Sequence, residues 1–316
     1  MKLLVITGAN GFIGRHLLNK VVASGQRVRA LTRTPRSVGP AAGGIDWVVG
    51  DISAPDTWNR LVEPGCTVVN LASSQEAGTA AAVSATKEMV AACAAAGTSR
   101  LVHCSTISVY GRAAGTTHTE TSPCNPIDEY GRLKLAVEQA LFDSVQGRFE
   151  LAVLRPAAVF GQGGQSLLSL CDDLIGGSRV VNYWRSSLFG RRRMHLVPVD
   201  TVVAAIRFLH EIRKPLDNEV FIVSDDDDPL NNFRDVERIL MEGLRIGRYA
   251  IPRVPLPRFM LENLLRMKGR SEIDTRTAYR CDKLLSCGFA KPIAFEAALR
   301  GFAGAFRQAR KHGNAA

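Results

Sequence analysis

The spacing of apolar residues changes repeatedly along the first half of the chain. Short runs rich in Val, Ile and Leu are followed by longer stretches in which apolar residues recur every three or four positions. The first pattern is typical of a buried strand and the second of an amphipathic helix. We therefore expect strands at Lys2–Thr7, Arg27–Thr32, Asp46–Val49, Thr67–Leu71, Arg100–Cys104 and Glu150–Arg155, and helices near Phe12–Ala23, Pro55–Leu61, Ala80–Ala96 and Asp128–Asp143.

Strands that alternate with helices predict a doubly wound parallel α/β sheet, the Rossmann architecture, because βαβ crossovers are right-handed. After Pro156 the alternation weakens, and Gly161-Gln162-Gly163-Gly164 interrupts it. We expect a Rossmann domain at residues 1–160. A smaller mixed α/β lobe at residues 161–316 is expected to bind substrate and to be interleaved with the first domain. Within it, Asp225–Asp228 followed by Pro229 predicts a polar turn.

Composition limits the class of protein. The 316 residues are 46% hydrophobic and 22% charged, which is ordinary for a globular chain. No run approaches the roughly 18 apolar residues of a membrane span, and the apolar start is shorter than a signal peptide requires. Seven cysteines, none spaced C-x-x-C, favour reduced thiols over disulfides or a metal site. We expect a cytoplasmic protein without a bound metal.

The net charge of +10 has two interpretations. Clustered basic residues occur in nucleic-acid-binding proteins, but there aromatic side chains usually interleave with them, and here they do not. We therefore expect an anionic small-molecule substrate, with neither a nucleic acid nor a membrane as partner.

A glycine-rich loop follows the first expected strand. Gly8 permits a tight turn, Gly11 lets the backbone approach a pyrophosphate, and Gly14 permits close packing of helix and strand. Phe12 and Ile13 open the helix, whose N-terminal N–H groups and dipole favour phosphate. The position between a strand and a helix makes this loop a strong prediction of a dinucleotide site.

The end of the second strand bears on the choice of cofactor. NAD sites usually carry a carboxylate here, but this chain has Arg33 and Arg36. An arginine can pair with the 2′-phosphate of NADP. We predict NADP, with Arg33 as its ligand and Arg36 as a helper, and NAD as the alternative. Asp51 and Ile52, just after the third strand, are expected near the adenine.

Tyr130 and Lys134 lie one helical turn apart, so their side chains share a face. A tyrosine with a pKa near 10 is a poor acid–base catalyst at neutral pH. A lysine ammonium nearby should favour the phenolate and lower this pKa. Ser105 and Thr106 follow the fifth strand, at the edge where doubly wound sheets bind ligands. A hydroxyl there can polarise a substrate carbonyl that Tyr130 also contacts.

Together, the glycine loop, Ser105-Thr106-Ile107-Ser108-Val109-Tyr110-Gly111 and the Tyr130/Lys134 pair resemble the extended short-chain dehydrogenase/reductase family. That family includes nucleotide-sugar epimerases, dehydratases and 4-keto reductases. The resemblance covers the first 160 residues well and continues more faintly through Leu154-Arg155-Pro156, Arg193–Asp200 and Asp282-Lys283-Leu284.

The resemblance implies roles for single residues. Tyr130 matches the family's general acid–base, and Lys134 the residue that also binds the nicotinamide ribose. Thr106 matches the catalytic Ser/Thr, with Ser105 as the reserve candidate, and Arg193 an arginine that contacts the diphosphate of sugar nucleotides. Leu71 and Ala72, at the end of the fourth strand, are assigned to the cofactor site.

The chain also departs from the family. The segment after Asn70 reaches its helix early, and Ala158 stands where many sugar-nucleotide enzymes have asparagine. The leading hypothesis is an NADP(H)-dependent reductase of a keto group on a nucleotide-linked sugar. Three alternatives remain: a nucleotide-sugar C4 epimerase with retained NAD, a reductase of a non-nucleotide ketone or aldehyde, and a non-catalytic dinucleotide-binding sensor or scaffold. Many relatives dimerise through the helix that carries Tyr130, so a homodimer is an open option.

Overall fold

The computed structural model describes residues 2–34, 44–72, 78–111, 117–252, 254 and 277–313. The chain divides into two compact units. The first unit consists of Met1–Ala113, Pro123–Pro156 and Val202–Ile222, and the second of Ala114–Ser122, Ala157–Thr201 and Val223–Ala316. The chain leaves the first unit after Ala113, Pro156 and Ile222, and returns to it at Pro123 and at Val202. The domain boundary expected at residue 160 stays a prediction. The binding roles expected for the two parts remain predictions.

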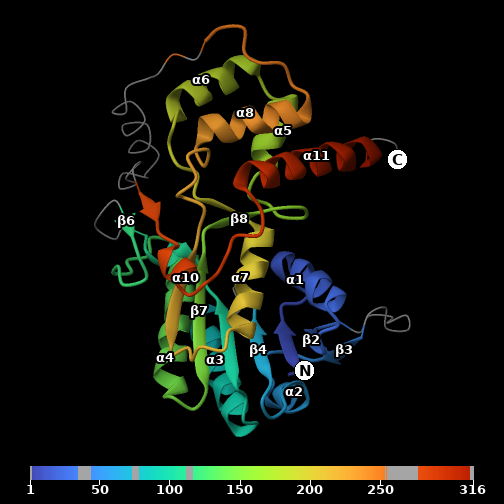
Figure 1. Cartoon of the computed structure of the whole chain (residues 1–316), viewed down its shortest axis with the longest axis vertical. Helices are drawn as coiled ribbons and strands as arrows, with labels where there is room; N and C mark the ends of the chain where they lie inside the picture. The colour runs from blue at the N-terminus through green and yellow to red at the C-terminus, as the bar shows by residue number, and fades with distance from the viewer. Residues whose placement is uncertain are drawn as a thin grey trace. The chain divides into compact units, whose positions relative to one another are not determined.

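A seven-stranded sheet forms the centre of the first unit (Figure 1), in the order β10-β7-β5-β4-β1-β2-β3. Neighbouring strands from β7 to β3 pair in parallel, so the predicted doubly wound α/β fold is confirmed. The six expected strands are β1 (Leu4–Thr7), β2 (Val28–Thr32), β3 (Ile45–Val49), β4 (Thr67–Asn70), β5 (Arg100–Cys104) and β7 (Glu150–Pro156). The seventh, β10 (Glu219–Val223), was not predicted and lies beside β7 at the sheet edge.

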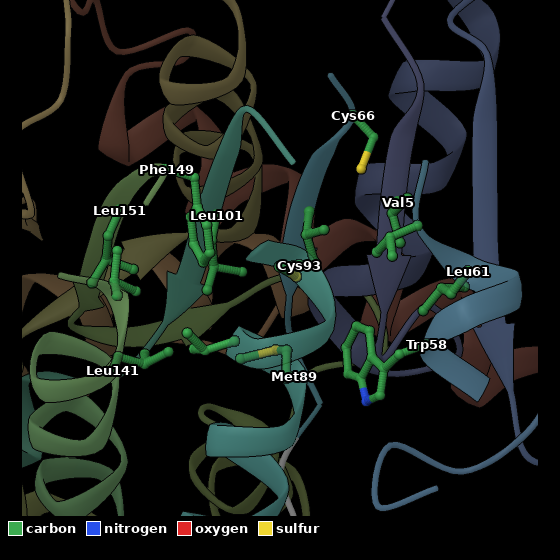
Figure 2. Packing of buried hydrophobic residues seen from close by; sticks show 14 of the residues in the cluster. Val5, Trp58, Leu61, Cys66, Met89, Cys93, Leu101, Leu141, Phe149 and Leu151 are labelled. Carbon is green, nitrogen blue, oxygen red and sulfur yellow. The ribbon is translucent and has the colours of Figure 1, made fainter. Parts of the chain in front are cut away.

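Side chains alternate between the two faces of this sheet, as strand geometry requires. Val5, Val68 and Leu101 belong to one buried cluster, together with Trp58 of α2 and Met89 of α3 (Figure 2). Leu4 and Ile6, which alternate with Val5 along β1, are buried on the opposite face of the sheet. The helices of this unit are α1 (Phe12–Ala23), α2 (Pro55–Leu61), α3 (Gly78–Ala95), α4 (Glu129–Val145) and most of α7 (Val199–Glu211).

The second unit has its own hydrophobic core, in which Phe160 packs edge-on against Phe295 and Phe302. Two short parallel pairs lie in it, β6 (Thr117–His118) with β11 (Ala278–Tyr279) and β8 (Ala158–Phe160) with β9 (Leu196–Pro198). Its helices are α5 (Leu168–Gly176), α6 (Arg179–Phe189), α8 (Phe233–Leu244), α10 (Asp282–Ser286) and α11 (Phe295–Gly313).

The acidic run at Asp225–Asp228 forms the predicted turn. The N–H of Asp228 donates to the carbonyl of Asp225 at 3.0 Å. The buried Asp225 carboxylate pairs with Lys291, whose Nζ lies 2.8 Å from Oδ1 and 2.6 Å from Asp227 Oδ1. The acidic charge is therefore partly neutralised by a lysine of the same unit.

Candidate active site

The glycine loop packs closely against the end of β4. Gly8 has φ +66°, a left-handed conformation that favours glycine. A Cβ on Gly8 would lie 2.6 Å from the carbonyl carbon of Leu71 and 2.7 Å from the N of Ala72. A Cβ on Gly14 would collide with the carbonyl oxygen of Gly8. The loop therefore excludes side chains at both positions, and the backbone of Leu71 and Ala72 lies beside it. Their role in binding the cofactor stays a prediction.

The N-terminus of α1 is open to an anion. Gly11 caps the helix without a side-chain hydrogen bond, and the first turn, which begins with Phe12 and Ile13, has no acidic residue. Its N–H groups and the positive end of the helix dipole are therefore available to a phosphate. These residues fit the pyrophosphate of a dinucleotide.

Arg33 and Asp51 lie at the carboxyl ends of the neighbouring strands β2 and β3. Hydrogen bonds from Ser53 and the positive charge of Arg33 lower the pKa of Asp51. Ile52 is partly buried against the core, and its carbonyl accepts a hydrogen bond from Trp58 Nε1 at 2.8 Å. Arg33 is exposed, and Arg36 lies outside the described residues. The predicted contact of Arg33 with a 2′-phosphate stays a prediction.

Helix α4 brings the predicted acid–base pair to the end of β5. Lys134 is buried, and its Nζ donates to the carbonyl of Cys104 at 3.1 Å. Tyr130 is 37% exposed, and its ring centroid lies 6.0 Å from Lys134 Nζ. The side chains therefore share one helix face, and the lysine is anchored one residue before Ser105.

The expected lowering of the Tyr130 pKa by Lys134 was wrong. Burial, with the nearby Cys104 and Asp128 groups, raises the pKa of Tyr130 to about 12. Burial also lowers the pKa of Lys134, despite the nearby Cys104 and Glu138 groups. The ammonium is 6.0 Å from the ring centroid and hydrogen bonds to a backbone carbonyl. Tyr130 is therefore protonated at neutral pH and suited to donating a proton.

The candidate hydroxyls follow β5 directly. Thr106 caps the short helix η2 (Ile107–Val109), and its Oγ1 accepts from the N–H of Ser108 at 3.2 Å. Ser105 is buried, and its Oγ has no hydrogen-bond partner among the described residues. Both hydroxyls lie beside Cys104, to which Lys134 binds, so the sheet edge brings the predicted catalytic residues of the first unit together.

Sequence reasoning missed a row of three hydrogen-bonded polar side chains across the sheet, Thr7, Asn70 and His103, which we call the polar row. Thr7 Oγ1 lies 2.6 Å from Asn70 Oδ1, and Asn70 Nδ2 lies 3.1 Å from His103 Nδ1. The three residues are adjacent in register on β1, β4 and β5. Burial and the charge of Lys134 keep the pKa of His103 well below its usual value. The period-two alternation would place these residues on the face of Val5 and Leu101, but it could not reveal their hydrogen bonds.

Sequence reasoning also missed how α4 is held. Glu138, one turn after Lys134, forms a buried ion pair with Arg155 of β7, and Arg155 Nη1 donates to Tyr110 Oη at 2.9 Å. The i, i+4, i+8 spacing of Tyr130, Lys134 and Glu138 was the signal that could have identified the glutamate.

Arg193 belongs to the second unit, where it forms a β-bridge with Asn232. Its predicted contact with a diphosphate therefore stays a prediction. Within the described ranges, no helix combines the length and apolar character needed to span a bilayer. The same ranges contain no group of three or more His, Cys, Asp or Glu side chains placed to hold a metal ion.

A sequence profile of the NAD dependent epimerase/dehydratase family matches residues 4–223. The chain belongs to this family, which confirms the assignment made from its motifs. The match spans β1 to β10, and therefore covers the glycine loop, the end of β5 and helix α4.

Several individual proteins are similar to this chain in sequence or in fold. A dTDP-6-deoxy-L-talose 4-dehydrogenase (NAD(P)(+)) of Kitasatospora kifunensis is 37% identical over 181 residues, 53% of this chain and 56% of the relative. A dTDP-4-dehydrorhamnose reductase of Mycobacterium tuberculosis is 34% identical over 191 residues, 55% and 56% of the two chains. This chain thus spans about half the length of the curated relatives it matches. The solved Bordetella bronchiseptica enzyme WbmG, in complex with NAD, shares the fold at TM-score 0.73 and 19% identity, covering 98% of this chain and 94% of its own.

Proposed function

We propose that the chain is an NADP(H)-dependent oxidoreductase that reduces a keto group of a nucleotide-linked sugar. The observation that carries this proposal is the placement of Tyr130 and Lys134 on α4 against the end of β5, where Ser105 and Thr106 follow. The names of the two curated relatives, both enzymes of dTDP-linked sugars, support this substrate class.

The cofactor, when bound, supplies or accepts the hydride. Gly8, Gly11 and Gly14, with the first turn of α1, would hold its pyrophosphate, and Lys134 would hold the nicotinamide ribose. Arg33 would bind the 2′-phosphate of NADP. Asp51 and Ile52 would lie beside the adenine.

Residues of the chain supply the proton that the carbonyl oxygen takes up during reduction. Thr106, with Ser105 as the reserve, donates a hydrogen bond to the substrate carbonyl and polarises it. Tyr130 then donates its phenolic proton to the carbonyl oxygen as the carbon is reduced. A pKa of about 12 keeps Tyr130 protonated at neutral pH, so its phenol carries the proton that reduction of a carbonyl requires. Arg193 is proposed to bind the substrate diphosphate.

Cofactor binding tests the proposal first. We expect calorimetry to show tighter binding of NADPH than of NADH, and Arg33→Ala to weaken NADPH binding about ten-fold or more, because a charge-assisted contact is lost. The matched control is Arg27→Ala, which removes an exposed arginine paired with Glu63 before the amino end of β2. It should leave both affinities unchanged.

Three other results would contradict parts of this proposal. Equal binding of NADPH and NADH would remove the role of Arg33, and a chain that purifies with retained NAD would favour the C4 epimerase, which returns the hydride to its own substrate. Absence of binding by either nucleotide would contradict the oxidoreductase proposal. Turnover of keto sugar nucleotides with NADPH then tests the substrate class.

A further inference from the structure

Helix α4 carries a buried carboxylate, that of Glu138, which has no role in the proposed reaction. Glu138 is 1% exposed and Arg155 is 5% exposed, and Arg155 Nε lies 3.1 Å and 3.2 Å from the two carboxylate oxygens. The fully buried Tyr110 adds a third member, because its hydroxyl accepts from Arg155 Nη1 at 2.9 Å. We call these three residues the buried anchor.

The buried anchor connects three segments that meet at the candidate active site. Glu138 is on α4, one turn after Lys134, and Arg155 is at the carboxyl end of β7. Tyr110 follows η2 and ends the segment that begins with Ser105 and Thr106. The guanidinium carbon also lies 4.9 Å from the Tyr110 ring centroid, so a cation–π contact adds to the hydrogen bonds.

A second contact holds the amino end of the same helix to the same segment. A Cβ on Gly131 would lie 2.7 Å from the carbonyl oxygen of Ser108 and 2.9 Å from Pro126 Cβ. The Asp128 side chain caps this turn by accepting from the N–H of Gly131 at 2.7 Å. Helix α4 therefore contacts the Ser105–Tyr110 segment at Gly131, between Tyr130 and Lys134, and is linked to it again through Glu138, one turn after Lys134.

The chemistry of the pair argues against a role in stability alone. Removing two charges from water costs much of what their attraction returns, so apolar replacements of a buried ion pair are often neutral or stabilising. Burial by itself would lower the pKa of Arg155, but the hydrogen bonds and charge of Glu138 outweigh it and raise the pKa. The Arg155 guanidinium donates hydrogen bonds from Nε and Nη2 to Glu138 and from Nη1 to Tyr110, and these bonds fix the positions of both partners.

We propose that Glu138, Arg155 and Tyr110 are positioning residues that hold Tyr130 of α4 in register with Thr106. The inference rests on the proposed function, because it assigns these residues to the geometry of that reaction. None of the three contacts the substrate. They act by fixing the distance between the proton donor and the hydroxyl that polarises the carbonyl.

The main test is the double variant Glu138→Leu/Arg155→Met, which removes both charges and leaves neither one buried alone. We expect kcat to fall about 10- to 100-fold, because small displacements of catalytic groups cost this much. The Kd for NADPH and the thermal unfolding midpoint should stay near the values of the parent chain. Tyr110→Phe, which removes only the hydroxyl, should give a smaller loss in kcat.

Hydrogen exchange measured by mass spectrometry supplies a readout that needs no substrate. Peptides covering residues 105–111 and 129–134 should exchange faster in the double variant, while peptides of α1 should not. The control Arg27→Met/Glu63→Leu removes an exposed ion pair of the same unit and should leave both peptides unchanged. Arg155→Lys, which keeps the charge without the fork, should resemble the double variant more than the parent in kcat.

Two outcomes would overturn the proposal. Unchanged exchange in both peptides would show that the buried anchor does not hold these segments, whatever the turnover. Faster exchange throughout the unit, with a lower unfolding midpoint, would show a general structural role. If the parent chain reduces no keto sugar nucleotide, the proposed function fails, while the exchange data still decide whether the anchor positions α4.

Discussion

At the scale of single residues, burial changes the chemistry that the sequence suggested. The spacing of Tyr130 and Lys134 predicted a tyrosine with a lowered pKa, but burial raises that pKa to about 12. The Lys134 ammonium donates a hydrogen bond to the carbonyl of Cys104. The same two residues thus remain the acid–base candidates, with Tyr130 protonated at neutral pH.

The pH dependence of keto reduction follows from this pKa. The protonated phenol is the active form, so its contribution is complete below the pKa and is lost as the pH rises through about 12. We expect kcat for reduction to show no loss from Tyr130 between pH 7 and about 10. Steady-state rates across this range, with NADPH saturating, provide the measurement. A fall centred near neutral pH would contradict the assignment.

Tyr130→Phe tests the same residue by removing its proton. We expect kcat to fall about 100- to 10,000-fold, the usual contribution of general acid catalysis, with NADPH affinity nearly unchanged. Tyr183→Phe is the matched control, because its hydroxyl bonds the carbonyl of Pro252 in the second unit. Retained turnover in Tyr130→Phe would assign the proton to another group.

At the scale of elements, close approach between backbone segments explains why glycine stands in the loop after β1 and in the first turn of α4. The glycines at 8 and 14 pack where any Cβ would collide with backbone, and Gly131 does the same against Ser108. The first two were predicted from their place between a strand and a helix. Gly131 was not, because the need for it comes from a segment more than 20 residues earlier in the chain.

Gly14→Ala tests the packing of α1 on the loop. The added methyl group meets the Gly8 carbonyl, so α1 must shift. We expect a loss of about 1–3 kcal/mol in the free energy of unfolding, typical of overpacking, and weaker NADPH binding. Gly301→Ala in α11 is the control, because its Cβ meets nothing within 4 Å and should stabilise the helix slightly. Urea titration and calorimetry measure the two effects.

At the scale of the whole molecule, two units share one chain that passes between them several times. Strand β10 illustrates the consequence, because residues from beyond position 200 complete a sheet whose other strands precede position 157. The polar row of Thr7, Asn70 and His103 likewise joins three strands across the sheet. Such long-range contacts set the electrostatics of the unit.

Acid should destabilise the unit that contains His103. Burial, with the charge of Lys134, holds the pKa of His103 well below its unfolded value of 6.5, so the folded state resists protonation. The unfolded state binds more protons below pH 6.5, and stability therefore falls as the pH drops. The slope for one such group is about 1.4 kcal/mol per pH unit. Urea unfolding at pH 7 and pH 5 should show this loss, and His103→Gln should reduce it; an equal loss in both chains would exclude His103 as its source.

Most strands and helices of the first unit, and the family of the chain, could be predicted from the order of residues alone. Apolar periodicity predicted six strands and four helices, and the glycine loop and Tyr130/Lys134 pair identified the family, because these signals lie within one element or one turn. The seventh strand, the raised pKa of Tyr130, the polar row and the buried anchor became visible only in the folded chain. These depend on burial and on contacts between segments distant in sequence, and no local pattern of residues encodes either.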